Sequence, residues 1–168
     1  MKNFDNCCVN PCCATRPSCC NPCCPCPPSA PENILVAAGT GVDPFEFLNL
    51  TLNIPFANNL YEQGNAVRHT ANSPDFVILE TGQYRIDYQL SVYDPVLLDL
   101  DIMEISVSLV SNLSGVLDTI DFTVPLQLAQ RSVTVNLSVA ETLVLQASQP
   151  YLSEMRVNSQ AIVITKLS

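Results

Sequence analysis

The residue type with the most obvious chemistry in this 168-residue chain is cysteine, because all nine copies lie between Cys7 and Cys26. They form four adjacent pairs and one single residue, with the spacing CC-x3-CC-x5-CC-x2-CC-x-C. Adjacent cysteines seldom pair with each other, since neighbouring residues fit the geometry of an unstrained disulfide poorly. We therefore expect each pair to reach two different partners. The predicted disulfide-forming residues are Cys7, Cys8, Cys12, Cys13, Cys19, Cys20, Cys23, Cys24 and Cys26.

A metal–thiolate cluster is the alternative chemistry for these cysteines. Cys20 and Cys23 have the two-residue spacing of many zinc ligands. However, no histidine lies nearby, and the surrounding prolines restrict folding around an ion. Disulfides are therefore the favoured interpretation, and neither a bound metal nor another cofactor is predicted. Because residues 32–168 contain no cysteine, every disulfide must lie within or between N-terminal segments.

The segment that carries the cysteines differs in composition from the rest of the chain. Residues 1–31 hold seven of the thirteen prolines and too few apolar side chains for a core of their own. The CPCPP run and Pro31 favour an extended, polyproline-like backbone, which could reach roughly 90 Å at about 3 Å per residue. We predict an N-terminal connector arm, residues 1–31, followed by one folded domain, residues 32–168.

The folded domain shows the two-residue period of β-strands and no sustained helical period. Apolar and polar side chains alternate over residues 48–54, 84–92 and 132–139, which is typical of strands with one buried and one wet face. About nine short strands in this length indicate an all-β sandwich. Further strands are predicted at residues 33–39, 75–80, 103–110, 116–123, 142–148 and 160–167, between turn signals such as Thr81-Gly82, Asp94-Pro95, Ser114-Gly115 and Gln149-Pro150.

Charge and hydropathy exclude two classes of partner. The formal net charge is −9, and the folded domain holds five Lys and Arg against fifteen Asp and Glu. This is the wrong sign for neutralising a phosphate backbone, so nucleic acid is not expected as a partner. No apolar run approaches the roughly 18 residues that a membrane span needs, so no membrane partner is expected either.

Catalytic residues are scarce. His69 is the only histidine, and no G-x-S-x-G, H-E-x-x-H or phosphate-binding loop occurs. We predict that His69 is a loop or structural histidine and that the protein is not an enzyme. Asp94, Asp99 and Asp101 could bind calcium, but their spacing alone does not make a site, and a solvated acidic loop is favoured.

The domain also holds more aliphatic side chains than a small monomeric sandwich needs. Residues 96–110 and 116–147 include double-sided apolar stretches such as VLLDLDIM and TLVLQ. An apolar outer face on one sheet predicts burial by a partner. A larger internal core is the alternative.

The compartment is ambiguous from the residues alone. Nine cysteines in a short segment normally indicate an oxidising environment, yet the start MKNFDNCC has no apolar region typical of a secretory signal. A metal-loaded cytosolic tail, a non-classical exit, or release by lysis of the producing cell would each explain this.

Three segments carry a resemblance to a known family. LNIPFANN, LETGQYRIDYQLSV and the ending AIVITKLS resemble the C-terminal domain of the Bacillus collagen-like exosporium glycoproteins, over roughly residues 33–168. That domain is a homotrimeric jelly roll of the tumour-necrosis-factor type, so the resemblance implies the same fold and assembly here. It also implies that an E-T-G-x-Y segment enters a central strand and that a closing I-x-I-x-K strand lies near the middle of the trimer. The matching residues are Glu80, Thr81, Gly82 and Tyr84, and Ile162, Ile164 and Lys166.

The arm departs from that family, whose members have a collagen-like stalk at this place. Arms with paired cysteines are instead similar to the connectors of endospore appendage (pilus) subunits. The combined resemblance implies a structural subunit of an extracellular fibre on the endospore surface, or exosporium, whose trimers stack head to tail through the arm. Three arms would then supply each other's disulfide partners. Since three times nine cysteines is odd, at least one thiol per trimer must stay free or pair elsewhere.

Phe4 is the only large aromatic residue of the arm. We predict that it docks into the apex of the neighbouring trimer, with a disordered tip as the alternative. Exosporium anchor and tip proteins are further possible partners. The alternative function is a tip adhesin or exosporium-anchored head that binds a host or surface ligand. A second alternative is a metal-storing cysteine tail on an unrelated β domain.

Overall fold

The computed structural model describes residues 33–40, 51–93, 104–123, 126–148 and 156–168. These residues belong to one compact unit, Pro31–Ser168. The predicted arm, with Phe4 and all nine cysteines, lies outside the described residues, so its boundary at residue 31 stays a prediction. The described ranges contain strands and no helix, and therefore no helix that could cross a membrane.

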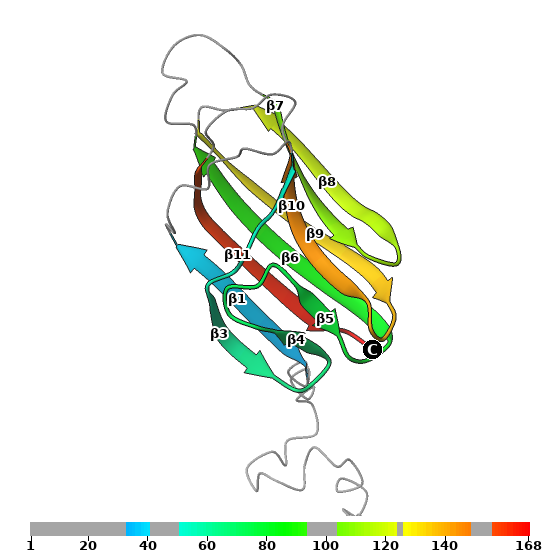
Figure 1. Ribbon diagram of the computed structural model, residues 1–168. Helices are drawn as coiled ribbons and strands as arrows, with labels where there is room; N and C mark the ends of the chain where they lie inside the picture. The colour runs from blue at the N-terminus through cyan, green and yellow to red at the C-terminus, as the bar shows by residue number, and fades with distance from the viewer. Residues whose placement is uncertain (1–32, 41–50, 94–103, 124–125, 149–155) are drawn as a thin grey trace, which may run out of the picture. The chain divides into compact units, whose positions relative to one another are not determined.

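Eleven strands in the described residues form two antiparallel sheets that face each other (Figure 1). The five-stranded sheet has the order β3-β1-β11-β6-β9, and the six-stranded sheet has the order β4-β5-β10-β7-β8 with β2 paired to β10. The predicted all-β sandwich is confirmed. The strands are β1 (Ile34–Thr40), β2 (Thr51–Asn53), β3 (Asn58–Gln63), β4 (Val67–His69), β5 (Phe76–Ile78), β6 (Gly82–Tyr93), β7 (Glu104–Ser111), β8 (Gly115–Thr123), β9 (Leu126–Leu137), β10 (Thr142–Ser148) and β11 (Arg156–Lys166).

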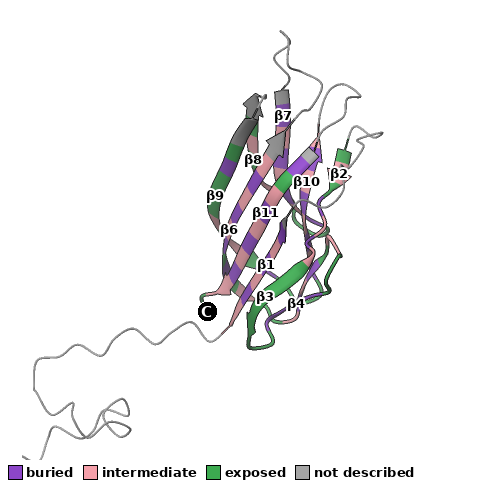
Figure 2. Ribbon diagram, turned by 90° about the vertical axis from the view of Figure 1, so that its left-hand side faces the viewer, coloured by how far each residue is buried: buried purple, intermediate pink, exposed green. Residues whose placement is uncertain are grey.

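The core lies between the two sheets, and alternation along the strands fills it. Buried and partly exposed residues alternate along β10 and β11 (Figure 2). Each fully buried large side chain contributes about 1.5–3 kcal/mol of hydrophobic stabilisation. The largest core side chains are Tyr84, Tyr88, Phe56, Phe76, Leu35, Ile54, Ile78, Ile86, Leu90, Ile105, Leu109 and Leu137.

The predicted alternation is confirmed over most of its length, with one error in β9. Leu137 is buried as predicted, but Val139 lies beyond the end of the strand and is exposed. The chain turns here because the Val139 amide donates to Thr81 Oγ1 (3.1 Å) and Ala140 takes a left-handed conformation with φ 69°. Leu48 and Leu50 lie outside the described residues.

The strands β3 and β4 were not predicted from the sequence. All six residues of β3 are exposed (Figure 2), because the strand pairs only with β1 at the edge of its sheet. A strand without a buried face has no alternation to detect. β4 has only three residues, which is too short to show a period.

One end of the sandwich, which we call the basal end, joins both sheets. β1 begins and β11 ends there, and the amide of Lys166 donates to the carbonyl of Asn33 (3.1 Å). The β7–β8 and β9–β10 turns also lie at this end, where the amide of Asn112 donates to the carbonyl of Thr142 (3.0 Å). Asn33, the first described residue, therefore lies at the basal end.

Candidate association surface

The outer face of the five-stranded sheet carries an unusual run of apolar side chains. In the register of β1 and β11, Val36 lies opposite Val163 and Ala38 lies opposite Ala161. On the other side of β1, Tyr61 of β3 lies opposite Val36. These side chains face away from the core and are exposed or only partly buried. We call the set the apolar stripe: Ile34, Val36, Ala38, Tyr61, Ala161 and Val163.

The stripe exists because β1 and β11 are apolar on both faces. Leu35, Ala37 and Ile162 lie between the stripe residues in sequence and point into the core, where they are fully buried. A sheet with one wet face would alternate with polar residues instead. Adjacent apolar side chains that stay partly exposed on an outer face are a candidate interaction surface.

The other half of the same face is polar. On β6, Arg85 and Asp87 form an ion pair (Nε–Oδ2 2.9 Å), and Thr134 of β9 lies opposite Arg85. A hollow of about 270 Å³ separates the two halves. Its walls combine stripe residues with polar ones: Asp87, Tyr88, Gln89, Gln130, Ala161 and Val163.

Among the described residues, the apolar outer face lies on β1 and β11 and not within residues 104–110 and 116–147 as expected. The TLVLQ stretch of β10 places Leu143 and Leu145 in the core, so the larger internal core accounts for it. The outer face of the six-stranded sheet is mainly polar, and Ser108 Oγ lies 2.9 Å from Thr119 Oγ1. Residues 96–103, which carry the VLLDLDIM stretch, lie in the part of the chain that the structure does not describe.

The E-T-G-x-Y segment closes the basal end. The Tyr84 hydroxyl donates to the carbonyl of Glu80 (2.5 Å), and Lys166 Nζ donates to the Glu80 carboxylate (2.7 Å). Burial, and then the charge of Glu80, raise the pKa of Tyr84 to about 12. A Cβ on Gly82 would lie 2.2 Å from the carbonyl of Ser168, so only glycine fits without a shift. As the resemblance implied, the segment enters a strand, β6, that is paired on both sides.

Ile162 and Ile164 of the I-x-I-x-K segment are fully buried and face the core. Ala161 and Val163 of the same strand face outward instead, opposite Ala38 and Val36. A partner on this face would therefore contact the residues between the isoleucines. If β11 lies near the middle of a trimer, as the resemblance implies, Ala161 and Val163 are the side chains of β11 that would contact the partner subunits.

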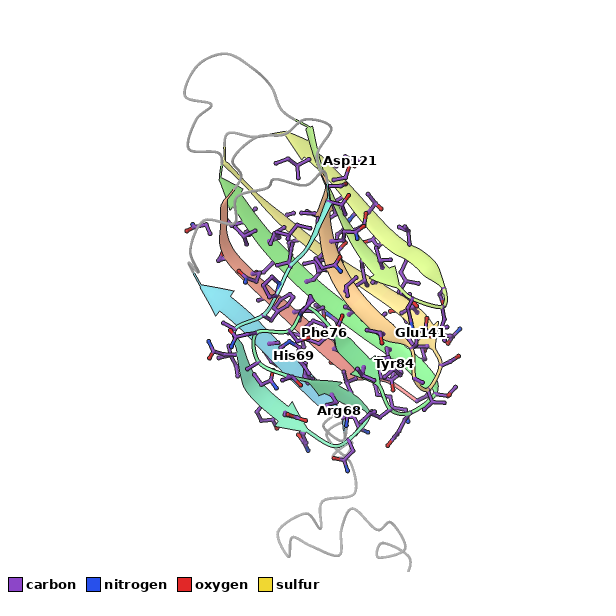
Figure 3. The ribbon with its side chains drawn as sticks, viewed as in Figure 1. Arg68, His69, Phe76, Tyr84, Asp121 and Glu141 are labelled. Atoms are coloured by element: carbon purple, nitrogen blue, oxygen red, sulfur yellow. The ribbon has the colours of Figure 1, made fainter. Side chains whose placement is uncertain are left out.

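His69 is a structural residue, on β4 rather than in a loop. Its ring is buried and stacks on Phe76 at 4.4 Å between centroids (Figure 3). Nε2 donates to the carbonyl of Ser73 (2.9 Å), and Nδ1 lies against Oδ1 of Asn59. Burial lowers the pKa of His69, although the Ser73 carbonyl partly opposes this. Both ring nitrogens are occupied by structural contacts.

The described residues contain no group of three or more His, Cys, Asp or Glu side chains that could hold a metal ion. The candidate calcium ligands Asp94, Asp99 and Asp101 lie outside those residues. The nine cysteines and Phe4 lie outside them too. The predicted roles of these residues stay predictions, and the apolar stripe is the feature that sequence reasoning placed elsewhere.

Comparisons with known proteins identify the fold. The sequence matches no protein-family model and no curated protein. In structure the chain is similar to murine APRIL: in its crystal structure at pH 8.5 the TM-score is 0.60, with 11% identity over 80% of this chain and 98% of that chain. At pH 8.0 the TM-score is 0.58, with 12% identity over 80% and 99%. The domain is an all-β jelly-roll sandwich of the tumour-necrosis-factor type, as predicted.

A signal for the stripe was present in the sequence. Residues 34–38 (ILVAA) and 161–164 (AIVI) are unbroken apolar runs, the pattern of a strand buried on both faces. The pairing of these two runs, from opposite ends of the domain, is visible only in the fold.

Proposed function

We propose that the chain is a structural subunit of an extracellular fibre on the endospore surface. Its jelly-roll heads form homotrimers through the apolar stripe, and its N-terminal arms connect one trimer to the next by disulfides. The single observation that carries this proposal is the stripe, where Val36 and Val163 lie opposite each other on the outer face of the sheet and stay only partly buried.

The charge of the chain makes the stripe the natural contact between copies. Each copy has a formal net charge of −9, so copies repel each other. The stripe has no charged side chain, and burying apolar surface contributes roughly 25 cal/mol for each Å² removed from water. Association through this face gains hydrophobic energy without bringing carboxylates together.

The division of cysteines supports the cross-linking role. All nine lie in the arm, so disulfides would join arms and leave the heads unaltered. A contact between one subunit and the next that does not close on itself propagates into a fibre. Disulfides would then stabilise that contact by restricting the unfolded chains.

The test is assembly of the full chain in the oxidised and the reduced state. We expect native mass spectrometry to give trimers under reductant and negative-stain electron microscopy to give regular fibres after air oxidation. Monomeric heads under both conditions would overturn the proposal. Discrete trimers that never form fibres would instead favour the tip adhesin or anchored head.

A further inference from the structure

Exposed large apolar side chains gather at the basal end. Of the seven among the described residues, four lie there, on two turns and on the last residues of the chain. They are Leu113 (65% exposed), Val116 (64%), Val139 (56%) and Leu167 (50%).

Hydrogen bonds join the segments that carry these side chains into one surface. The Glu141 carboxylate accepts from the Ser114 hydroxyl (2.6 Å) and from the amide of Ser138 (2.8 Å), which links the β7–β8 turn to the β9–β10 turn. The Val139 amide donates to Thr81 Oγ1 (3.1 Å), which links that turn to the start of β6.

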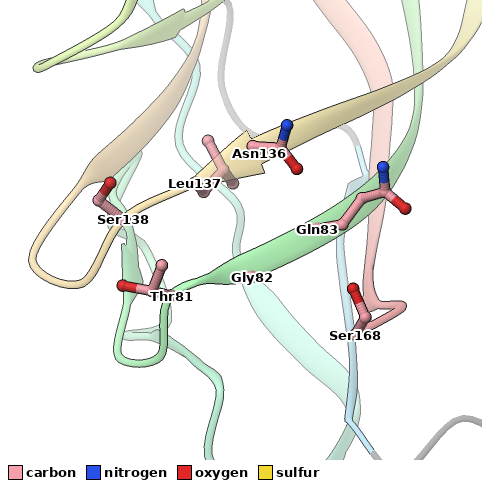
Figure 4. Close-up of a pocket in the computed structure, with 7 residues that line it drawn as sticks. All are labelled: Thr81, Gly82, Gln83, Asn136, Leu137, Ser138 and Ser168. Atoms are coloured by element: carbon pink, nitrogen blue, oxygen red, sulfur yellow. The ribbon is translucent and has the colours of Figure 1, made fainter.

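The same chain of contacts reaches the C-terminal residues. The amide of Leu167 donates to the carbonyl of Gln83 (2.7 Å), and the amide of Gln83 donates to the carbonyl of Ser168 (3.1 Å). Between these segments lies an open hollow of about 440 Å³ (Figure 4). We call this surface the basal rim, which consists of residues 81–83, 111–116, 136–141 and 166–168.

Glu141 keeps the rim in a fixed shape. Its side chain is 1% exposed and also accepts a hydrogen bond from the Ser111 hydroxyl (Figure 3). A buried carboxylate is costly unless its oxygens are hydrogen-bonded, and here serine donors from both turns satisfy it. The network therefore fixes the two turns relative to each other. Leu113 and Val139 lie at their tips, where polar residues are usual, and expose apolar side chains to water.

The rim is also free of net side-chain charge. The charged side chains in its ranges are Glu141, which is buried, and Lys166, which pairs with Glu80 at 2.7 Å. A preorganised surface with exposed apolar side chains and no net side-chain charge, on a chain of net charge −9, suits contact with another copy of the same chain.

We propose that the basal rim binds a second copy of this chain, the next subunit along the fibre. We call this contact between successive subunits the axial contact. Asn33, the first described residue, lies at this end, because its carbonyl accepts from the Lys166 amide. In the proposed fibre the segment that precedes Asn33 in the sequence connects to the next subunit, so we expect the rim to face that subunit. This inference rests on the proposed fibre function, and it separates the axial contact from the stripe, which joins heads within one trimer.

The test removes three of the rim's four exposed large apolar side chains, keeps Leu167 and leaves the stripe intact. In the full chain, the triple variant Leu113→Ser, Val116→Ser and Val139→Ser is compared with Leu60→Ser, which removes an equally exposed leucine from β3, away from the rim. We expect the triple variant to keep the trimer in native mass spectrometry and to shorten fibres at least ten-fold in electron microscopy. We expect Leu60→Ser to leave fibre length unchanged.

The outcomes separate this inference from the proposed function. Wild-type-length fibres from the triple variant would overturn the axial role of the rim and leave the fibre function standing. A wild-type chain that forms no fibres would overturn both. A circular dichroism spectrum and a thermal midpoint close to those of the wild type show that the triple variant is folded. The single variant Val139→Lys, which adds a charge to the rim, should also shorten the fibres.

Discussion

The outer faces of the two sheets differ in the polarity of their side chains. On the six-stranded sheet, Ser108 lies within hydrogen-bond distance of Thr119, and Ser106 donates to Asp121 (2.5 Å), so neighbouring strands satisfy each other's polar side chains. On the five-stranded sheet, Val36 lies opposite Val163 and nothing polar replaces them. The first face is stable in water as it stands, whereas the second gains from a cover.

The difference teaches that strand period alone does not decide which face is wet. β7 and β11 both alternate with a period of two, and both place apolar side chains in the core. The outward positions at the centre of each strand differ: Ser106 and Ser108 on β7, but Ala161 and Val163 on β11. The outward positions are free to vary once the core is filled, and the proposed assembly depends on them.

The largest effect should come from placing charge on the stripe. In the double variant Val36→Asp and Val163→Asp, two carboxylates would face each partner, and we expect the dissociation constant of the trimer to rise at least about 100-fold. Sedimentation or native mass spectrometry measures this. The matched control is Ser108→Asp and Gln146→Glu on the other sheet, which should associate like wild type. Equal association of the stripe variant and the control would remove the distinction between the faces.

A second prediction concerns the close packing at the basal end, where Gly82 at the start of β6 lies against the C-terminal residues. Gly82→Ala would place a Cβ 2.2 Å from the carbonyl of Ser168 and 2.8 Å from Lys166 Cε. We expect the free energy of unfolding to fall by about 2–3 kcal/mol, because backbone must move. Gly115→Ala has open space around its Cβ but φ 76°, so it should cost only about 1 kcal/mol. Urea unfolding gives both values, and a reversed order would contradict this geometry.

A third prediction concerns the pH dependence of the basal turns. Burial alone would raise the pKa of Glu141, but hydrogen bonds from Ser111, Ser114 and Ser138 outweigh it and hold the pKa below its usual value. The folded state therefore favours the ionised form. Its stabilising contribution is fully present above the unfolded pKa of about 4.3 and is lost as pH falls through the lower folded value.

The variant Glu141→Gln should remove this pH dependence. At pH 7 we expect it to lower the free energy of unfolding by about 1–2 kcal/mol, because charge-assisted hydrogen bonds are replaced by weaker ones. Below pH 4 the difference from wild type should shrink. A constant difference between pH 7 and pH 3, in urea unfolding at matched ionic strength, would show that the ionised carboxylate is not what stabilises the turns.

The sequence predicted most strands that have at least one buried face and missed β3, which has none, and β4, which has only three residues. β6 was predicted because Tyr84, Ile86 and Tyr88 alternate strictly with polar residues and are buried as expected. β3 was missed because both of its faces are wet. The run 34–38 was predicted as a strand. That its second apolar face forms one surface with β11 is visible only from the register of the two strands.

The candidate sites divide in the same way. The prediction that His69 is a structural residue is confirmed. One of its ring contacts is local in sequence, since the carbonyl that accepts from Nε2 belongs to Ser73, only four residues later. The basal network of Glu141 was not predicted, because its partners Ser111 and Ser114 lie in a different turn, about 30 residues earlier. Local chemistry could be read from sequence, whereas chemistry that joins two turns required the fold.

The smallest predicted effect tests whether basal closure and association through the stripe are separate. Lys166, at the end of β11, pairs with Glu80, whose side chain is 46% exposed, so the pair should contribute only about 0.2–1 kcal/mol. We expect Lys166→Met to lower the free energy of unfolding within that range, less at high salt, and to leave the trimer's dissociation constant unchanged. A double-mutant cycle with Glu80→Gln isolates the pair. Weakened association in Lys166→Met at unchanged stability would show that this end of β11 belongs to the same contact as Val163, and the stripe would then extend to the basal end.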